Sequence, residues 1–247
     1  MNDLSQLLFS ISYKALPLLF AIVLHEYAHG WVADKCGDST AKLQGRLTVN
    51  PLAHIDLFGT IIMPILCLMM PGGFLLGWAK PVPIDPRQMT RPRRDMALVA
   101  AAGPGMNFAL ALFSGLLLAI VLWVDPTLSM QQRSAGGSES GASSSTIVLL
   151  PIAVMALYSV LINVFLALFN LIPIPPLDGG RILVSLLPPQ PALALARLEP
   201  YGMLILVGLL VFDRDLRVIH TISSTFASGL SGTILSTAIG LGAGASP

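Results

Sequence analysis

The sequence predicts an all-α polytopic membrane protein with about five to six transmembrane helices and a short β-hairpin or re-entrant insert. The 247-residue chain is 54% hydrophobic and only 11% charged, whereas soluble domains carry about 25% charged residues. Its mean hydropathy is +0.77. Several apolar runs approach the roughly 20 residues that a spanning helix needs. The formal net charge of +1 gives no indication of nucleic-acid binding.

The first apolar run lies in a helix predicted over about residues 4–33 and ends in the motif His25-Glu26-x-x-His29. In a helix the two histidines lie on the same face, about 6 Å apart along the axis, so both imidazoles can reach one metal ion. Glu26 lies one step round the helix, where it can hold a water at that metal. This is the H-E-x-x-H arrangement of zinc hydrolases.

Three ionisable side chains in one membrane-length segment cost several kcal/mol unless a metal, water or partner groups compensate for them. The alternative interpretation is a helix end whose histidines only cap the helix and extend to the interface. The metal-binding interpretation is preferred because ionisable residues inside membranes usually carry function.

The segment after this helix is mixed in character. Gly45–Asn50 is followed by Pro51 and contains β-branched residues, which predicts a short strand and then a turn. The apolar run Leu57–Met70 is shorter than a spanning helix. It crosses the membrane if it extends to Trp78, and otherwise it re-enters. Lys80–Ile84 is predicted to be extended, because its prolines exclude a helix.

The densest basic loop of the chain lies between residues 87 and 94 and is predicted to be cytoplasmic. Its arginines are Arg87, Arg91, Arg93 and Arg94.

Further apolar segments follow this basic loop. A helix over about residues 95–124 contains Gly103-Pro104, which implies a kink or a close approach of the backbone. A flexible Ser/Gly-rich loop on the other side of the membrane leads to a helix over about residues 147–172. A short apolar run over residues 201–212 could begin near residue 192, with Arg197 and Glu199 paired at the interface. The tail over residues 220–247 is either a weak sixth helix or a surface segment.

Two histidines do not complete a catalytic zinc site, which usually has three protein ligands and a water. Asp178 is the favoured third ligand, because it follows an apolar helix within a Pro-rich stretch that unwinds the backbone. Gly179 and Gly180 let this stretch approach closely, and unwound backbone at membrane depth is tolerated only around a buried or watery cavity. The alternative is that Asp178 caps a helix that continues through Arg181. The other candidate ligands are Cys36, His54, Asp56, Glu199 and His220.

Three motifs occur in order along the chain. They are His25-Glu26-x-x-His29, then Ala102-Gly103-Pro104, then Phe169–Pro173 leading to Leu177–Arg181. Their combination resembles the site-2 protease family of intramembrane zinc metalloproteases, and the matching stretch covers about residues 10–190. The resemblance implies a single intramembrane metalloprotease domain over residues 1–247, with additional C-terminal membrane segments over residues 191–247.

The resemblance also implies a role for each site residue. His25, His29 and Asp178 would bind one Zn²⁺ per chain. Glu26 would be the general base, and Asn170 would steady the oxyanion or the substrate carbonyl. A strand at Gly45–Asn50 could pair with an unwound substrate, since an added strand is recognised through its backbone. The predicted substrate contacts are Gly45, Leu47, Val49 and His54.

The implied partners are a transmembrane protein or peptide substrate and the lipid bilayer, without nucleic acid, and the oligomeric state is left open. The implied process is regulated intramembrane proteolysis or clearance of signal-peptide remnants. The expected location is the cell (inner or plasma) membrane, with a multi-pass topology and the active site towards the cytoplasm. The alternatives are a membrane metalloenzyme with another class of substrate and a non-proteolytic metal-binding protein or transporter. Transporters usually contain repeated halves, and the sequence contains no internal repeat.

Overall fold

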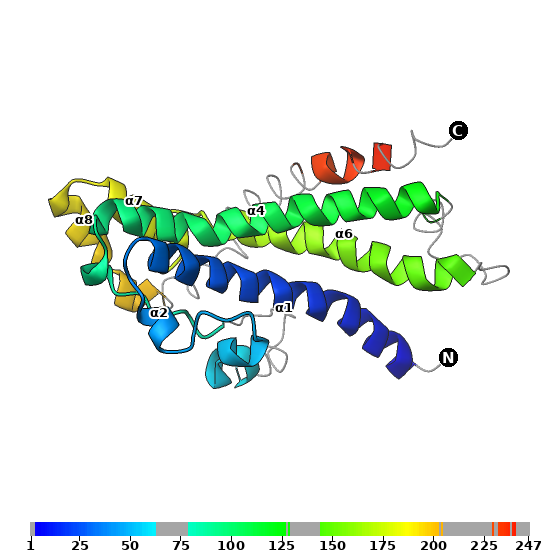
Figure 1. The fold of residues 1–247 in the computed structure, drawn as a ribbon, viewed down its shortest axis with the longest axis horizontal. Coiled ribbons are helices and arrows are strands. Elements are labelled where there is room, and N and C mark those ends of the chain that lie inside the picture. The colour runs from blue at the N-terminus through cyan, green and yellow to red at the C-terminus, as the bar shows by residue number, and fades with distance from the viewer. Residues whose placement is uncertain are drawn as a thin grey trace. The chain divides into compact units, whose positions relative to one another are not determined.

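The structure is a computed structural model that describes residues 3–62, 79–126, 128, 144–202, 204, 229, 232–237 and 239–240. It is mostly helical, and the described residues contain no strand. The labelled α-helices are α1 (Asp3–Lys35), α2 (Thr40–Leu43), α4 (Pro92–Val124), α6 (Ser144–Asn170), α7 (Asp178–Leu186) and α8 (Pro189–Ala196), and residues 232–237 are also helical (Figure 1). Short 3₁₀ turns lie at Pro51–His54, Pro86–Gln88 and Glu199–Tyr201, and a π turn lies at Leu57–Ile62.

The three longest helices confirm the long helices that the sequence predicts, to within a few residues at each end. The described part of the chain contains three helices that are long and apolar enough to cross a membrane, at Tyr13–Lys35, Pro92–Val124 and Val148–Asn170. The further spans expected near residues 57–78 and 201–212 fall largely outside the described residues. The total of five to six spans therefore stays a prediction.

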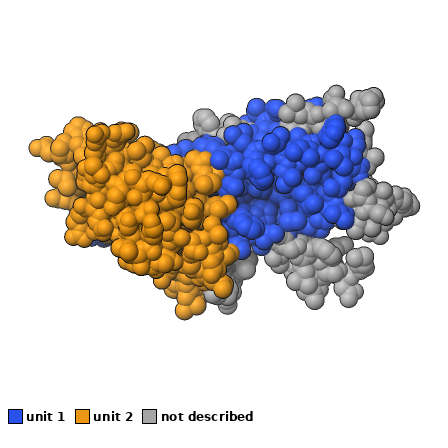
Figure 2. All heavy atoms as spheres, viewed as in Figure 1, with its two compact units in different colours: residues 1–21, 107–171, 201–247 blue, residues 22–106, 172–200 orange. Residues whose placement is uncertain are grey.

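The chain divides into two compact units (Figure 2). Unit 1 comprises residues 1–21, 107–171 and 201–247, and unit 2 comprises residues 22–106 and 172–200.

In unit 1, the second half of α4 packs against α6 through a core that includes Leu118, Leu122 and Ala156. A polar contact interrupts this apolar seam, because Ser114 and Ser159 share a hydrogen bond of 2.7 Å between their hydroxyls. Hydrogen bonds between membrane helices satisfy groups that lipid cannot satisfy. The apolar core therefore holds the two helices together, and the Ser114–Ser159 hydrogen bond sets their register.

In unit 2, α1 ends in a Schellman motif. Gly37 adopts a φ of +106°, which is a left-handed conformation that suits glycine. Its N–H donates to the carbonyl of Asp34, and the N–H of Asp38 donates to the carbonyl of Ala33. These bonds satisfy the last carbonyls of the helix, so the chain turns back sharply after Cys36.

The fully buried carboxylate of Asp38 ties this turn to the segment before α4. Its Oδ1 accepts from the N–H of Thr40 at 3.0 Å, and its Oδ2 accepts from the N–H of Asp85 at 2.7 Å. Residues 79–85 are thereby held beside the end of α1.

The strand expected at Gly45–Asn50 is wrong. The guanidinium of Arg46 instead donates to three carbonyls, those of Ala53, Lys80 (2.9 Å) and Pro81 (3.2 Å). A strand is stable only when its backbone forms hydrogen bonds with a neighbouring strand. Here the side chain of Arg46 takes up the carbonyls of the neighbouring segments instead. No β-hairpin forms among the described residues of this insert, and residues 63–78 lie outside them.

The interfacial pair expected between Arg197 and Glu199 is also wrong. Glu199 pairs with Arg181 on α7, at 2.8 Å. Because α8 ends at Ala196 and a 3₁₀ turn follows, the carboxylate lies closer to α7, which packs against α8.

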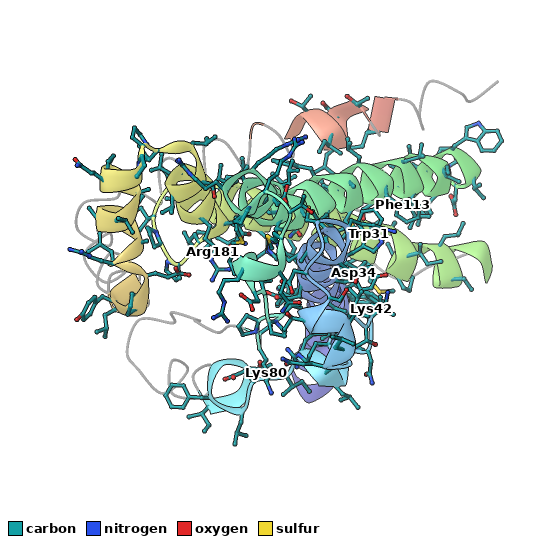
Figure 3. All side chains as sticks on the ribbon, turned by 60° about the vertical axis from the view of Figure 1, so that its left-hand side comes forward. Trp31, Asp34, Lys42, Lys80, Phe113 and Arg181 are labelled. Atoms are coloured by element: carbon teal, nitrogen blue, oxygen red, sulfur yellow. The ribbon has the colours of Figure 1, made fainter. Side chains whose placement is uncertain are left out.

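We predict that Asp38→Ala destabilises the protein by about 1–3 kcal/mol, because it leaves buried backbone donors without an acceptor. Thermal unfolding in detergent measures the effect. The control is Lys42→Ala, which removes only an exposed ion pair of 3.4 Å with Asp34 (Figure 3) and should cost less than about 1 kcal/mol. Equal stability of the two variants would contradict the tie assigned to Asp38.

Candidate metal centre

The metal centre contains the two histidines of α1, His25 and His29, whose rings lie edge to face. Both are buried, with exposed fractions of 8% for His25 and 6% for His29. Their Nε2 atoms lie 3.0 Å apart. Nδ1 of His29 donates to the carbonyl of Val99 on α4 at 2.7 Å, so its Nε2 is the ring nitrogen that faces His25 and Asp178. A hydrogen bond of this kind fixes the tautomer that a metal needs.

Asp178 joins the histidines from the first residue of α7. Its Oδ2 lies 3.1 Å from Nε2 of His25, and its Oδ1 lies 3.3 Å from Nε2 of His29. The N-cap of α7 is Leu177, and no side-chain hydrogen bond caps this helix. The alternative interpretation, in which Asp178 serves as a helix cap, therefore does not describe the structure.

The turn before α7 depends on a glycine. A Cβ at Gly180 would lie 2.4 Å from the nitrogen of Pro175 and 2.6 Å from the carbonyl carbon of Ile174. The stretch from Ile174 to Leu177 therefore lies directly on the first turn of α7, as the Gly-Gly pair predicts. This contact places Asp178 at the start of the helix.

The geometry of these three side chains fits a zinc ion. One ligand atom from each of His25, His29 and Asp178 lies within 4.8 Å of the others. Zinc at about 2.0–2.2 Å from each donor separates tetrahedral donors by about 3.3–3.6 Å. Burial alone would raise the pKa of Asp178, but the adjacent imidazoles outweigh burial and hold this pKa below its usual value. The carboxylate is thus the anion that a cation site requires.

Gly103 of α4 passes directly over the imidazoles. A Cβ at this position would lie 2.4 Å from Nε2 of His29 and 2.5 Å from Nε2 of His25. The close approach predicted at Gly103-Pro104 is confirmed by these contacts, and α4 continues through Pro104 as one helix.

Glu26 is held by a backbone group from the segment before α4. The N–H of Val82 donates to its Oε2 at 2.8 Å. The side chain of Val82 packs towards Gly30, where an added Cβ would lie 3.0 Å from its Cγ1. Val82 also lines a cavity of about 440 Å³, together with Gly180 and Arg181 of α7.

The four predicted substrate contacts occupy different environments. Leu47 packs near Gly30, where an added Cβ would lie 3.2 Å from its Cδ1. Val49 is 57% exposed, and Gly45 is exposed with a φ of +66°. His54 is buried in a 3₁₀ turn and its Nε2 donates to the carbonyl of Thr48 at 2.9 Å. Their roles towards a substrate stay predictions.

Asn170 is the last residue of α6 in unit 1. Its Nδ2 donates to the carbonyl of Leu166 within the same helix at 3.0 Å. Its role at the oxyanion stays a prediction.

Two groups at the site escape sequence analysis because they are backbone atoms. The carbonyl of Val99 orients His29, and the N–H of Val82 holds Glu26. Any residue other than proline supplies an N–H, and every residue supplies a carbonyl, so no residue type marks these positions. The Pro81–Val82–Pro83 pattern indicates only an extended chain.

The long apolar helices and the buried cluster of two histidines and an aspartate together define a membrane protein with a candidate metal centre. The sequence model of peptidase family M50 matches residues 13–211. The chain therefore belongs to this family, the site-2 protease family, and is a zinc metalloprotease.

Curated relatives agree with this assignment. YwhC of Bacillus subtilis, whose name calls it a zinc metalloprotease, is 39% identical over 81% of this chain and 80% of its own length. Rip2 of Mycolicibacterium smegmatis, similarly named, is 31% identical over 78% of this chain and 64% of its own length. Rip2 of Mycobacterium tuberculosis is 30% identical over 77% of this chain and 63% of its own length. No solved structure matches the chain significantly.

We predict that Gly103→Ala abolishes stoichiometric zinc binding, because the new methyl group would occupy the space of the two imidazole nitrogens. Metal analysis of the purified protein measures this. Gly105→Ala is the matched control on the same helix, since among the described residues no atom outside the adjacent helix backbone lies within 4 Å of an added Cβ there. Full zinc occupancy in Gly103→Ala would show that the imidazoles have room to move.

Proposed function

We propose that this protein hydrolyses peptide bonds within transmembrane segments of membrane proteins, with His25, His29 and Asp178 as zinc ligands and Glu26 as the general base. The observation that carries the proposal is the convergence of three buried side chains: the two Nε2 atoms lie 3.0 Å apart, and each lies 3.1–3.3 Å from one oxygen of Asp178. A zinc ion among these side chains would compensate the buried carboxylate and bind both imidazole nitrogens at once.

In this proposal Glu26 transfers a proton between the attacking water and the leaving amine. Zinc bound at this centre would act as a Lewis acid, which lowers the pKa of its bound water to about 7 and polarises the substrate carbonyl. Oε2 of Glu26 already accepts from Val82, so Oε1 takes the proton of the attacking water and then returns it to the leaving amine nitrogen. The bond to Val82 fixes the orientation of the carboxylate through both transfers.

Asn170 is assigned to the substrate carbonyl by its place in the motif, eight residues before Asp178. One such donor typically contributes about 3–4 kcal/mol to the transition state. Leu47 and Val49 are kept as proposed substrate contacts without strand pairing, since the segment forms no strand. The substrate is unwound in this proposal, because an intact helix hides its peptide bonds within its own hydrogen bonds.

We further propose that the chain spans the cell membrane five to six times with its active site towards the cytoplasm. Four arginines lie between residues 87 and 94, directly before α4. Short loops rich in Lys and Arg remain cytoplasmic. The process served is regulated proteolysis of membrane proteins or the clearance of signal-peptide remnants.

We predict that Glu26→Gln retains zinc but cleaves a transmembrane peptide at least about 100-fold more slowly, since general-base catalysis contributes roughly 10²–10⁴-fold. Zinc content and cleavage are measured on the same purified samples. Asp178→Ala is the comparison variant and should lose both. Cleavage at the wild-type rate by Glu26→Gln would overturn the assignment of the base, and stoichiometric zinc in Asp178→Ala would overturn the ligand set.

We predict that cysteines placed at Arg91 and Pro126, in a chain whose two native cysteines are replaced, react with impermeant thiol reagents from opposite sides of the membrane. These residues flank α4, which is about 50 Å long. The residue at Arg91 should be labelled only from the cytoplasmic side, using inside-out vesicles. Labelling of both residues from one side would refute the topology.

A further inference from the structure

The geometry points to Arg93 as a positioning residue for the metal centre. It binds the carbonyl end of α7, the short helix whose first residue is Asp178, and so fixes where that carboxylate lies. This inference rests on the proposed ligand set, because it concerns how Asp178 is held in place for zinc.

The contacts of Arg93 distinguish it from the other arginines of its loop. Its Nη2 donates to the carbonyl of Leu187, the C-cap residue of α7, and to the carbonyl of Ser185 at 3.4 Å. The carbonyls of the last turn of a helix have no partner within the helix. Pro188 and Pro189 follow directly and cannot continue the helix, so an outside donor satisfies these carbonyls.

The charge of Arg93 favours the same role. It lies in the first turn of α4, where the helix dipole disfavours a cation. Its guanidinium reaches the carbonyl end of α7, where the dipole favours one. A planar guanidinium with several donors suits two neighbouring carbonyls better than an ammonium does.

Helix α4 then supports two of the three proposed ligands. Its residue Val99 accepts the hydrogen bond that orients His29. Its residue Arg93 holds the far end of the helix that begins with Asp178. Because α7 has nine residues, about 13 Å of rigid helix separates the two ends. A tilt at the Arg93 end therefore displaces the carboxylate at the other end relative to the imidazoles.

The alternative is that the turn before α7 and its packing against α8 hold Asp178 without help. Gly180 lies tightly against Pro175, and Arg181 pairs with Glu199. In that case Arg93 would contribute only its positive charge to the basic segment at residues 87–94.

The test compares Arg93→Gln with Arg91→Gln in the full-length protein in detergent. Both variants remove one positive charge from exposed residues of the same loop. Zinc affinity is measured by competition with a chelator. We expect Arg93→Gln to weaken zinc binding by about 10–100-fold, as loss of a group that supports a metal ligand does. Arg91→Gln should stay within about twofold of the wild type, and Arg93→Lys should fall between the two.

Two further measurements separate positioning from a general loss of fold. The metal-free Arg93→Gln protein should melt within about 3 °C of the metal-free wild type. The absorption spectrum of bound Co²⁺ should shift in Arg93→Gln and stay unchanged in Arg91→Gln. Wild-type zinc affinity in Arg93→Gln, an equal loss in Arg91→Gln, or a matching collapse of the metal-free fold would each overturn the inference. Retention of zinc by Asp178→Ala would instead overturn the ligand set itself.

Discussion

The close passage of α4 over α1 at Gly103 is the constraint on which the site depends. At Gly103 the two helices lie so close that a side chain of even one carbon would overlap the imidazole nitrogens of His25 and His29. The approach brings the carbonyl of Val99 within 2.7 Å of His29. Protein interiors are densely packed and do not deform continuously, so the separation of these two helices also sets the orientation of the histidine.

The sequence predicts those parts of the site that are encoded by a regular residue spacing or by a short motif. The four-residue spacing of His25 and His29 requires only that the segment is helical, and α1 is helical throughout. The choice of Asp178 over the other acidic residues follows from its unwound, glycine-rich surroundings, and the structure brings its carboxylate to the same histidines. The long helices follow from apolar runs long enough to span a bilayer, because a single segment satisfies its own backbone hydrogen bonds there only as a helix.

The sequence does not predict parts that depend on tertiary partners. The β-branched stretch at Gly45–Asn50 favours a strand, but a strand is stable only with a neighbour, and Arg46 satisfies the nearby carbonyls instead. The same limit applies to Arg93, because its sequence context matches that of Arg91 and Arg94. Only the position of the end of α7 distinguishes it, and no local pattern encodes that position.

The segment beside Glu26 has a further property that follows from its prolines. Between Pro81 and Pro83, Val82 has the only N–H group, and Glu26 accepts from it. A peptide lying along these three residues would therefore meet acceptors but no free donor, and a regular two-way ladder could not form there. The prolines thus limit the number of backbone hydrogen bonds that any pairing chain could form beside Glu26.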